Sequence, residues 1–239
     1  MARKSFKAGA LTAPLPPVMV TVGDMESSNI ITIGWTGILS TIPPRTYISV
    51  RPERHSYKML KEKGEFVINL TTASQAKIVD YVGIYTGAKV DKFKECKLTK
   101  LESKEVSAPT IAECPFALEC RVVEIIPMGT HDVFIADIVS VSADDSIIDE
   151  AGKIRFDKAG LMAYAHGEYF ALGEKLGSFG FSTKKVAPKK STPKKNAVEN
   201  KPTTTPVSKE KTEENKKRPF YLDAPRGKGN KPKGKGKKK

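Results

Sequence analysis

The sequence predicts a mainly β protein, an antiparallel barrel with a few peripheral helices, followed by a basic C-terminal tail. Short runs of β-branched and aromatic residues recur over the first 182 residues, and Gly, Pro and Asp turn signals separate them. Strands and helices do not alternate, and most connections are too short for a crossover helix, which argues against a parallel sheet. The last 57 residues differ in composition from the rest. We therefore expect one domain over residues 1–182 and a separate tail over residues 183–239.

Four strands are expected in the first 70 residues. The second is interrupted by Gly34 and Gly37, which mark a bulge or a close approach of another backbone. Pro43 and Pro44 cannot continue a central strand, so they mark a turn or a sheet edge. The expected strands are Val18–Val22, Asn29–Leu39, Tyr47–Val50 and Phe66–Leu70.

Two short helices are expected beside these strands. Ser56 is interpreted as the N-cap of a helix over Tyr57–Lys63, and Gly64 stands where helices commonly end in a left-handed residue. Thr72 and Gln75 form a capping-box pattern that opens a second helix. The inner face of that helix would carry Ile78, Val79 and Val82.

The second half of the domain contains a hairpin signal. Apolar and polar residues alternate in Phe116–Ile126 and in Val133–Val141, and the short connection PMGTHD joins the two runs. This pattern predicts a hairpin with one face in the core. Residues 83–113 are irregular and charged, and an aromatic-rich last strand is expected over Leu161–Leu172.

The tail carries the net positive charge of the chain. Residues 183–239 contain 20 Lys or Arg and 5 Asp or Glu, whereas residues 1–182 contain 21 and 22. A segment so rich in Lys, Pro, Thr and Gly cannot bury enough apolar surface to fold, so we expect it to be disordered. Such a polycation either binds nucleic acid nonspecifically or serves only solubility. Its only aromatic residues, Phe220 and Tyr221, form the one stretch suited to docking in a pocket.

Several classes of chemistry are disfavoured. The sequence contains no HExxH, GxSxG or Walker motif, and no GxGxxG follows a strand. Cys96, Cys114 and Cys120 form no CxxC pair, so they are expected to be reduced, two of them in the core, and no metal site is expected. No run of apolar residues suits a membrane span or a signal peptide, so we expect a cytoplasmic protein without membrane contact.

One cluster has the chemistry of an anion site. Arg51, Arg54, His55 and Ser56 lie between the end of a strand and the start of a helix. Guanidinium groups and the N–H groups of a helix N-terminus bind phosphate well. The alternative is a solvated turn with a capping serine.

Three further residues are considered singly, and the first of them has two readings. Trp35, the only tryptophan, is either a core residue or the face of a flat ligand site, since Gly34 and Gly37 allow a ligand to approach the backbone. The local sequence around Lys92 suggests a surface lysine, and that around His131 suggests a residue of the hairpin connection.

Eight segments in order resemble the flavin reductase-like, FMN-binding split-barrel family, and within it flavoredoxin-type members. They cover roughly Ala13 to Ser182. They read PLPPVMVTV, NIITIGWTGILSTIPP, YISVRPERHSY, GEFVINL, VDKFK, ECPFALEC, GTHDVFIADIVSV and YAHGEYFALGEKLGSFGFS.

The resemblance implies an antiparallel split β-barrel that forms a homodimer, with one FMN per subunit near the interface. It implies that Trp35 faces the isoalloxazine ring with Tyr164 on another side, and that Lys92 is a cation beside N1/C2=O. Arg51, Arg54 and Ser56 would hold the 5′-phosphate, and His131 would contact the ring or an incoming nicotinamide. The family's flavin-contacting positions correspond here to Asn29, Thr32, Trp35, Thr36, Arg51, Arg54, His55, Ser56, Lys92, His131 and Tyr164.

The expected function is that of an oxidoreductase. It would move hydride or electrons from NAD(P)H or a redox protein through FMN to an acceptor, and no catalytic acid or base of the protein is expected. Two alternatives stay open. The protein could be an electron relay that carries flavin without oxidising NAD(P)H, or a nucleic-acid-associated protein whose barrel has lost its flavin.

Overall fold

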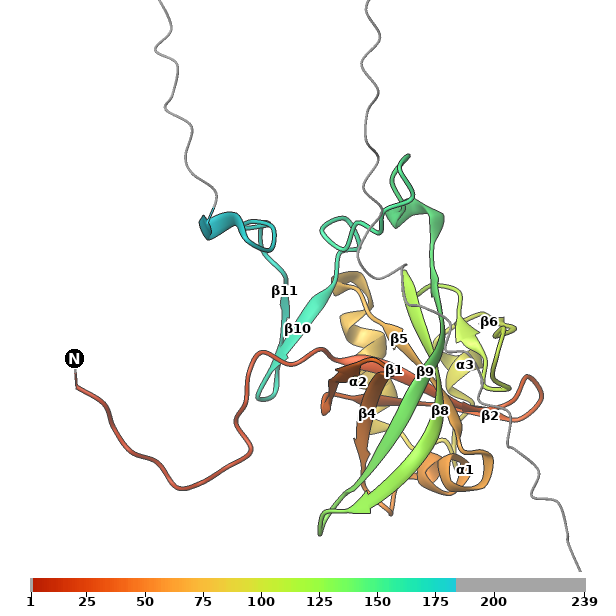
Figure 1. Cartoon of the computed structure of the whole chain (residues 1–239). Helices are drawn as coiled ribbons and strands as arrows, with labels where there is room; N and C mark the ends of the chain where they lie inside the picture. The colour runs from red at the N-terminus through yellow and green to blue at the C-terminus, as the bar shows by residue number, and fades with distance from the viewer. Residues whose placement is uncertain (1, 184–239) are drawn as a thin grey trace, which may run out of the picture. The chain divides into compact units, whose positions relative to one another are not determined.

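The computed structural model describes residues 2–183, so the predicted basic tail beyond Thr183, with Phe220 and Tyr221, lies outside the described residues. Figure 1 shows the arrangement of the elements. A turn of 3-10 helix, η1 (Ala73–Gln75), leads into α2, and two more follow β9 and β11. In chain order the strands and α-helices are β1 (Val18–Gly23), β2 (Ser28–Ile33), β3 (Thr36–Thr41), β4 (Pro44–Val50), α1 (His55–Lys63), β5 (Glu65–Leu70), α2 (Ala76–Ile84), α3 (Lys92–Glu95), β6 (Lys100–Leu101), β7 (Thr110–Ile111), β8 (Phe116–Pro127), β9 (Asp132–Ala143), β10 (Met162–Ala165) and β11 (Glu168–Ala171).

The main sheet has seven strands in the order β2-β1-β5-β8-β9-β4-β3, and every neighbouring pair is antiparallel. Its two edge strands, β2 and β3, are consecutive in the chain and are joined by Gly34 and Trp35. The sheet therefore curls back on itself, and the barrel stays split where β2 passes β4. The predicted mainly β, antiparallel split barrel with a few helices is confirmed.

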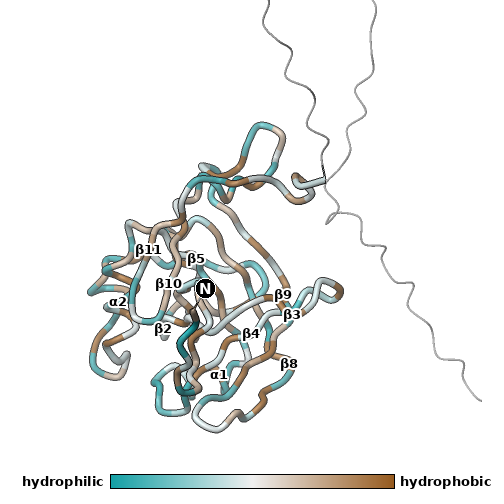
Figure 2. Tube along the Cα trace, turned by 90° about the vertical axis from the view of Figure 1, so that its left-hand side faces the viewer, coloured by the Kyte–Doolittle hydropathy of each residue, from teal (hydrophilic) through white to brown (hydrophobic). Residues whose placement is uncertain are grey.

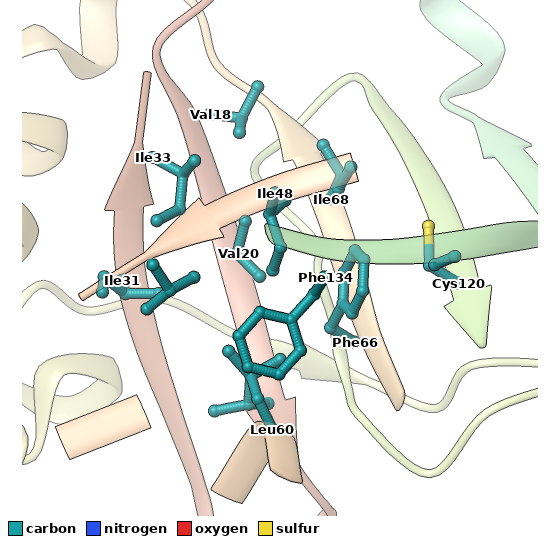
Figure 3. Close-up of a cluster of buried hydrophobic side chains, with 13 residues drawn as sticks. Val18, Val20, Ile31, Ile33, Ile48, Leu60, Phe66, Ile68, Cys120 and Phe134 are labelled. Carbon is teal, nitrogen blue, oxygen red and sulfur yellow. The ribbon is translucent and has the colours of Figure 1, made fainter. Parts of the chain in front are cut away.

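Two apolar layers follow from the alternation of side chains along β1. Val18, Val20 and Val22 point into the barrel, where they pack with residues such as Phe66 and Phe134 (Figure 3). Met19 points to the other face, against Val79, Val82 and other residues of the second layer. Because both faces of β1 are covered, all six of its residues are buried.

The single strand predicted over Asn29–Leu39 is wrong, because the chain changes partner at Gly34 and Trp35. Residues before this link pair with β1, and residues after it pair with β4. The Trp35 carbonyl accepts a hydrogen bond from the Ser49 N–H at 3.0 Å, which holds the link against β4.

The single strand predicted over Leu161–Leu172 is also wrong, because the segment forms the β10–β11 hairpin. Its two turn residues, His166 and Gly167, have φ values of 49° and 100°. Positive φ at both positions is the geometry of a type I′ turn, whose twist matches that of antiparallel strands.

The other local predictions are confirmed with small changes. The hairpin of residues 116–141 exists as β8 and β9, each longer than expected. Gly64 ends α1 with φ 63°, and its N–H donates to the Leu60 carbonyl. The capping box of Thr72 and Gln75 is present and opens η1 and then α2. The segment 83–113 is mostly irregular but contains α3, β6 and β7.

The cysteines are free thiols, and two of the three, Cys114 and Cys120, are buried as predicted. Among the described residues, no helix has the length and apolar character that crossing a membrane requires.

Candidate functional site

A cleft of about 380 Å³ opens where the barrel is split. Its floor includes Ile31 and Ile33, which belong at the same time to the barrel core drawn in Figure 3. The cleft is lined by Pro17, Ile31, Thr32, Ile33, Gly34, Trp35, Ser49, Val50, Arg51, Arg54, Gly83, His131, Tyr164 and Tyr169. The volume and the mainly apolar and aromatic lining are typical of a small-molecule site.

Trp35 lies in this cleft and is 40% exposed, so it is not a core residue. It occupies the link between β2 and β3. Its ring lies against that of His131, with centroids 4.6 Å apart and planes inclined by 41°. The two rings together border the cleft with aromatic surface.

Tyr164 and Tyr169 form another wall, on the β10–β11 hairpin. Tyr164 is held by two backbone hydrogen bonds with Leu15, at 2.9 and 2.8 Å. The Tyr169 hydroxyl donates to Asp80 on α2 at 3.3 Å, and burial, with Asp80 second, raises the pKa of Tyr169 to about 12. Sequence reasoning missed Tyr169, although it faces Tyr164 across the hairpin and a recognised His166-Gly167 turn would have placed the two together.

His131 is held as a neutral imidazole at neutral pH. Burial lowers its pKa, and the positive charges of Arg51 and Arg54 lower it further, against an opposing effect of Glu53. Its Nδ1 lies 3.0 Å from the Thr130 hydroxyl. The other ring nitrogen of His131 can therefore form one hydrogen bond with a ligand in the cleft, and the imidazole adds no positive charge there.

A second, smaller pocket of about 120 Å³ adjoins the cleft, because Arg54 and Ile31 line both. It is lined by Asn29, Ile31, Glu53, Arg54, His55, Ser56, Tyr85, Thr86, Gly87 and Lys92. The N-terminus of α1 contributes to this lining through His55 and Ser56, and the first N–H groups of a helix have no acceptor within the helix.

Ser56 is not the N-cap of α1, as the sequence suggested. The N-cap is Arg54, and Ser56 is buried in the first turn, where its Oγ accepts a hydrogen bond from Asn29 Nδ2 at 2.8 Å. The hydroxyl proton of Ser56 is therefore free for a ligand. Gly87 fits closely over this pair, because a Cβ there would lie 2.2 Å from Asn29 Oδ1.

Lys92 is buried, and its position differs from the one expected beside a flavin ring. It lines the second pocket and not the cleft. Its Nζ donates to the Ile30 carbonyl at 2.7 Å and to the Val82 carbonyl at 2.8 Å. Burial, and secondarily the charge of Arg54, lowers the pKa of Lys92 to about 8, so the amine is mostly protonated at neutral pH.

The remaining predicted residues already make hydrogen bonds within the protein, and they differ in whether they line a pocket. Arg54 Nη1 donates to the Gly83 carbonyl at 3.1 Å, at the end of α2. The Thr32 hydroxyl donates to the Val79 carbonyl, so Thr32 lines the cleft with its hydrogen bond already made. Thr36 lines neither pocket, and its hydroxyl donates to the Tyr47 carbonyl at 2.6 Å. Ten of the eleven predicted residues thus lie in the cleft or the second pocket.

The two pockets adjoin and differ in chemistry, a combination that suits a flat ring joined to one phosphate. The cleft offers aromatic surface, and the second pocket offers Arg54, Lys92 and the Ser56 hydroxyl as donors. This combination in a split barrel points to the class of flavin-related oxidoreductases.

The chain belongs to the family described as the flavin reductase like domain, whose model matches residues 11–173. It is 32% identical to the flavoredoxin of Desulfovibrio vulgaris (Miyazaki F), with a TM-score of 0.71, over 77% of this chain and 100% of that one. A flavoredoxin structure from Methanosarcina acetivorans is 24% identical, with a TM-score of 0.70, over 77% and 98%. An uncharacterized protein of Archaeoglobus fulgidus is 34% identical over 143 residues, which are 60% of this chain and 80% of the relative.

Proposed function

We propose that this protein binds one FMN per subunit and passes hydride or electrons from a reduced donor, NAD(P)H or a redox protein, through that flavin to an acceptor. One observation carries the proposal. The aromatic cleft and the basic second pocket meet at Arg54, so a single ligand with a ring at one end and a phosphate at the other can fill both. The flavoredoxin with 32% identity supports the same assignment.

FMN fits the donor set better than FAD. The second pocket is small, and it gathers the donors Lys92, Ser56 and Arg54 around one point. Among the described residues, the cleft adds to Arg54 only the guanidinium of Arg51, and it has no second cluster of donors around one point of the kind that a pyrophosphate would require. The heat-released cofactor, identified by mass spectrometry, tests this choice, and predominant FAD would contradict it.

FMN, when bound, supplies reversible one- and two-electron chemistry. The residues of the chain hold and orient it. Arg54, Lys92 and Ser56 would bind the phosphate, Trp35 and Tyr164 would border the ring, and the neutral His131 would offer it a hydrogen bond. Within residues 2–183 the lining of the cleft has no carboxylate, so the protein itself supplies no acidic group there.

We further propose that the protein is a homodimer. The edge strand β3 follows Trp35 directly and exposes Ile38 and Leu39, and Ile42 is exposed just after it. Figure 2 shows further hydrophobic stretches along β8 and β9. An exposed apolar edge of this kind favours association with another chain.

The absorption spectrum of the purified protein tests the proposal. A bound flavin gives an absorption band at about 450 nm, and anaerobic addition of NADH bleaches this band if NADH is the donor. A flavin that NAD(P)H does not bleach favours the electron relay. A colourless protein that binds neither added FMN nor riboflavin contradicts the proposed function.

A further inference from the structure

The two arginines that border the site are placed differently. Arg54 lines both the cleft and the second pocket, whereas Arg51 lines only the cleft. Between them the chain makes a tight turn, in which the Arg54 N–H donates to the Arg51 carbonyl at 3.1 Å. This turn fixes the Arg51 backbone at the end of β4, on the side of Trp35 and His131.

The Arg51 guanidinium is free to bind a ligand. Arg45, Arg121 and Arg155 each pair with a carboxylate, at 2.7, 3.3 and 2.7 Å. Arg51 makes no such pair within residues 2–183, and no carboxylate lines the cleft beside it. The nearby acid, Glu53, lines the second pocket.

The charge of Arg51 is therefore not cancelled in the cleft. This charge lowers the pKa of His131 more strongly than the charge of Arg54 does. Arg51 therefore faces the part of the cleft that the Trp35 and His131 rings border. With the flavin phosphate in the second pocket, the oxidised cofactor brings no second anionic group to this cation. Arg51 is exposed at a cleft that is bordered by the Trp35 and His131 rings, and a guanidinium in such a place selects for ligands that carry a carboxylate or a phosphate.

We propose that Arg51 binds the anionic group of the second substrate, a phosphate- or carboxylate-bearing donor or acceptor that enters the cleft beside Trp35 and His131. The assignment rests on the proposed function, because it requires the FMN phosphate to occupy the second pocket. It divides the two arginines, with Arg54 serving the cofactor and Arg51 the exchanging substrate.

Three glutamine variants that lose the same charge test this division. FMN and riboflavin affinities are measured for wild type, Arg51→Gln, Arg54→Gln and the control Arg45→Gln, whose arginine lies on β4 and pairs with Asp137. Only Arg54→Gln should weaken FMN binding, and riboflavin, which lacks the phosphate, should bind all four proteins alike.

The FMN-loaded wild type, Arg51→Gln and Arg45→Gln proteins are then titrated calorimetrically with three probes. Inorganic pyrophosphate represents a nucleotide, benzoate an aromatic carboxylate, and benzamide is the uncharged match of benzoate. Arg51→Gln should bind pyrophosphate or benzoate about tenfold more weakly, as expected for one partly exposed charge-assisted contact, and benzamide equally well. The anion that responds identifies the class of substrate.

Two results would overturn the assignment. One is anion binding that is absent in the wild type or unchanged in Arg51→Gln. The other is a loss of FMN affinity in Arg51→Gln, with riboflavin unaffected, which would make Arg51 a ligand of the cofactor phosphate. Both differ from failure of the proposed function, in which the wild type binds neither flavin.

Discussion

The Trp35 and His131 rings meet with centroids 4.6 Å apart, although one lies on the β2–β3 link and the other on the β8–β9 connection. The β2–β3 link and the β8–β9 connection, which both border the cleft, are therefore in contact through these two rings. Because Trp35 is the only tryptophan, its fluorescence reports on the cleft without interference from any other.

We predict that bound FMN strongly quenches the emission of Trp35 and that stripping the flavin restores it. A flavin in contact with an excited indole quenches it by accepting an electron or energy, and Trp35 borders the space assigned to the flavin ring. Emission spectra of holo-protein and stripped protein measure the effect, with free tryptophan plus FMN at the same concentrations as the control. Equal emission in both forms would remove Trp35 from the site.

The residues around Trp35 left its place open, because the flanking glycine and hydroxyl residues allow a ligand to approach, whereas a single tryptophan is more often a core residue. The strands of the barrel were predictable for a local reason, the alternation of apolar residues. Ser56 was misread because its partner, Asn29, comes 27 residues earlier, and no local pattern records that hydrogen bond. A serine before an amphipathic segment has the same sequence signature whether it caps the helix or lies buried inside its first turn.

Lys92 shows the same limit. The sequence around it, VDKFK, suggests a surface lysine in an irregular, charged segment, yet the fold brings the carbonyls of Ile30 and Val82 to its ammonium. Only tertiary structure separates a pocket lysine from a surface lysine here. The break at Gly34 and Trp35, by contrast, had a visible signal, and the error was to continue one strand through it.

We predict that FMN affinity falls as the pH rises above about 8. Lys92 titrates near this value in the flavin-free protein, with Arg54 and Cys96 as its charged or ionisable neighbours, and burial raises the pKa of the Cys96 thiol. A phosphate beside Lys92 favours the ammonium form, so the pKa in the complex is higher than in the free protein. Affinity is therefore full below the free pKa and declines above it, by at most roughly tenfold per pH unit.

Fluorescence titrations between pH 6.5 and 9.5 measure this dependence. Riboflavin is the control, because without a phosphate its affinity should stay flat over this window. Lys92→Met should weaken FMN binding at pH 7 and flatten the profile. A wild-type profile that is flat, or one that Lys92→Met leaves unchanged, would exclude Lys92 from phosphate binding.

We predict that Tyr57 positions His131. The Tyr57 hydroxyl donates a short hydrogen bond to Asp132, the residue next to His131, and its ring packs edge-on against Phe134 at 5.6 Å. Tyr57→Phe keeps the ring and removes this hydrogen bond. It should weaken FMN and riboflavin by the same factor, since the ring side of the site loosens while the phosphate pocket is untouched.

Tyr81→Phe, on α2, is the matched control and should change neither affinity. A variant Tyr57→Phe that weakens FMN alone would place the effect in the phosphate pocket. A variant that binds both flavins normally would limit Tyr57 to a role in packing.

We predict that Ile42→Glu converts a dimer into a monomer. Ile42 is 84% exposed and follows the edge strand β3, and a carboxylate there would be buried without a partner between two copies. Sedimentation velocity measures the change, with Ile84→Glu on the exposed end of α2 as the control. A wild-type protein that sediments as a monomer would contradict the dimer itself.

The tail gives the last prediction, which rests on charge alone. Residues 183–239 carry 20 basic and 5 acidic residues, against 21 and 22 in the rest of the chain. We propose that the tail binds nucleic acid without sequence preference, and that deleting residues 184–239 abolishes this binding. With about 6 phosphates engaged, the full chain should lose affinity on the order of a thousandfold between 50 and 200 mM salt.

A graded truncation shows whether charge is the cause. Deleting only residues 226–239 removes 8 Lys or Arg, so the slope of log affinity against log salt should become shallower without reaching zero. Flavin content and melting temperature, measured on the same proteins, should stay at the full-length values. A chain ending at residue 183 that still binds nucleic acid would place the basic surface on the barrel, whereas one that loses its flavin would tie the tail to the cofactor site.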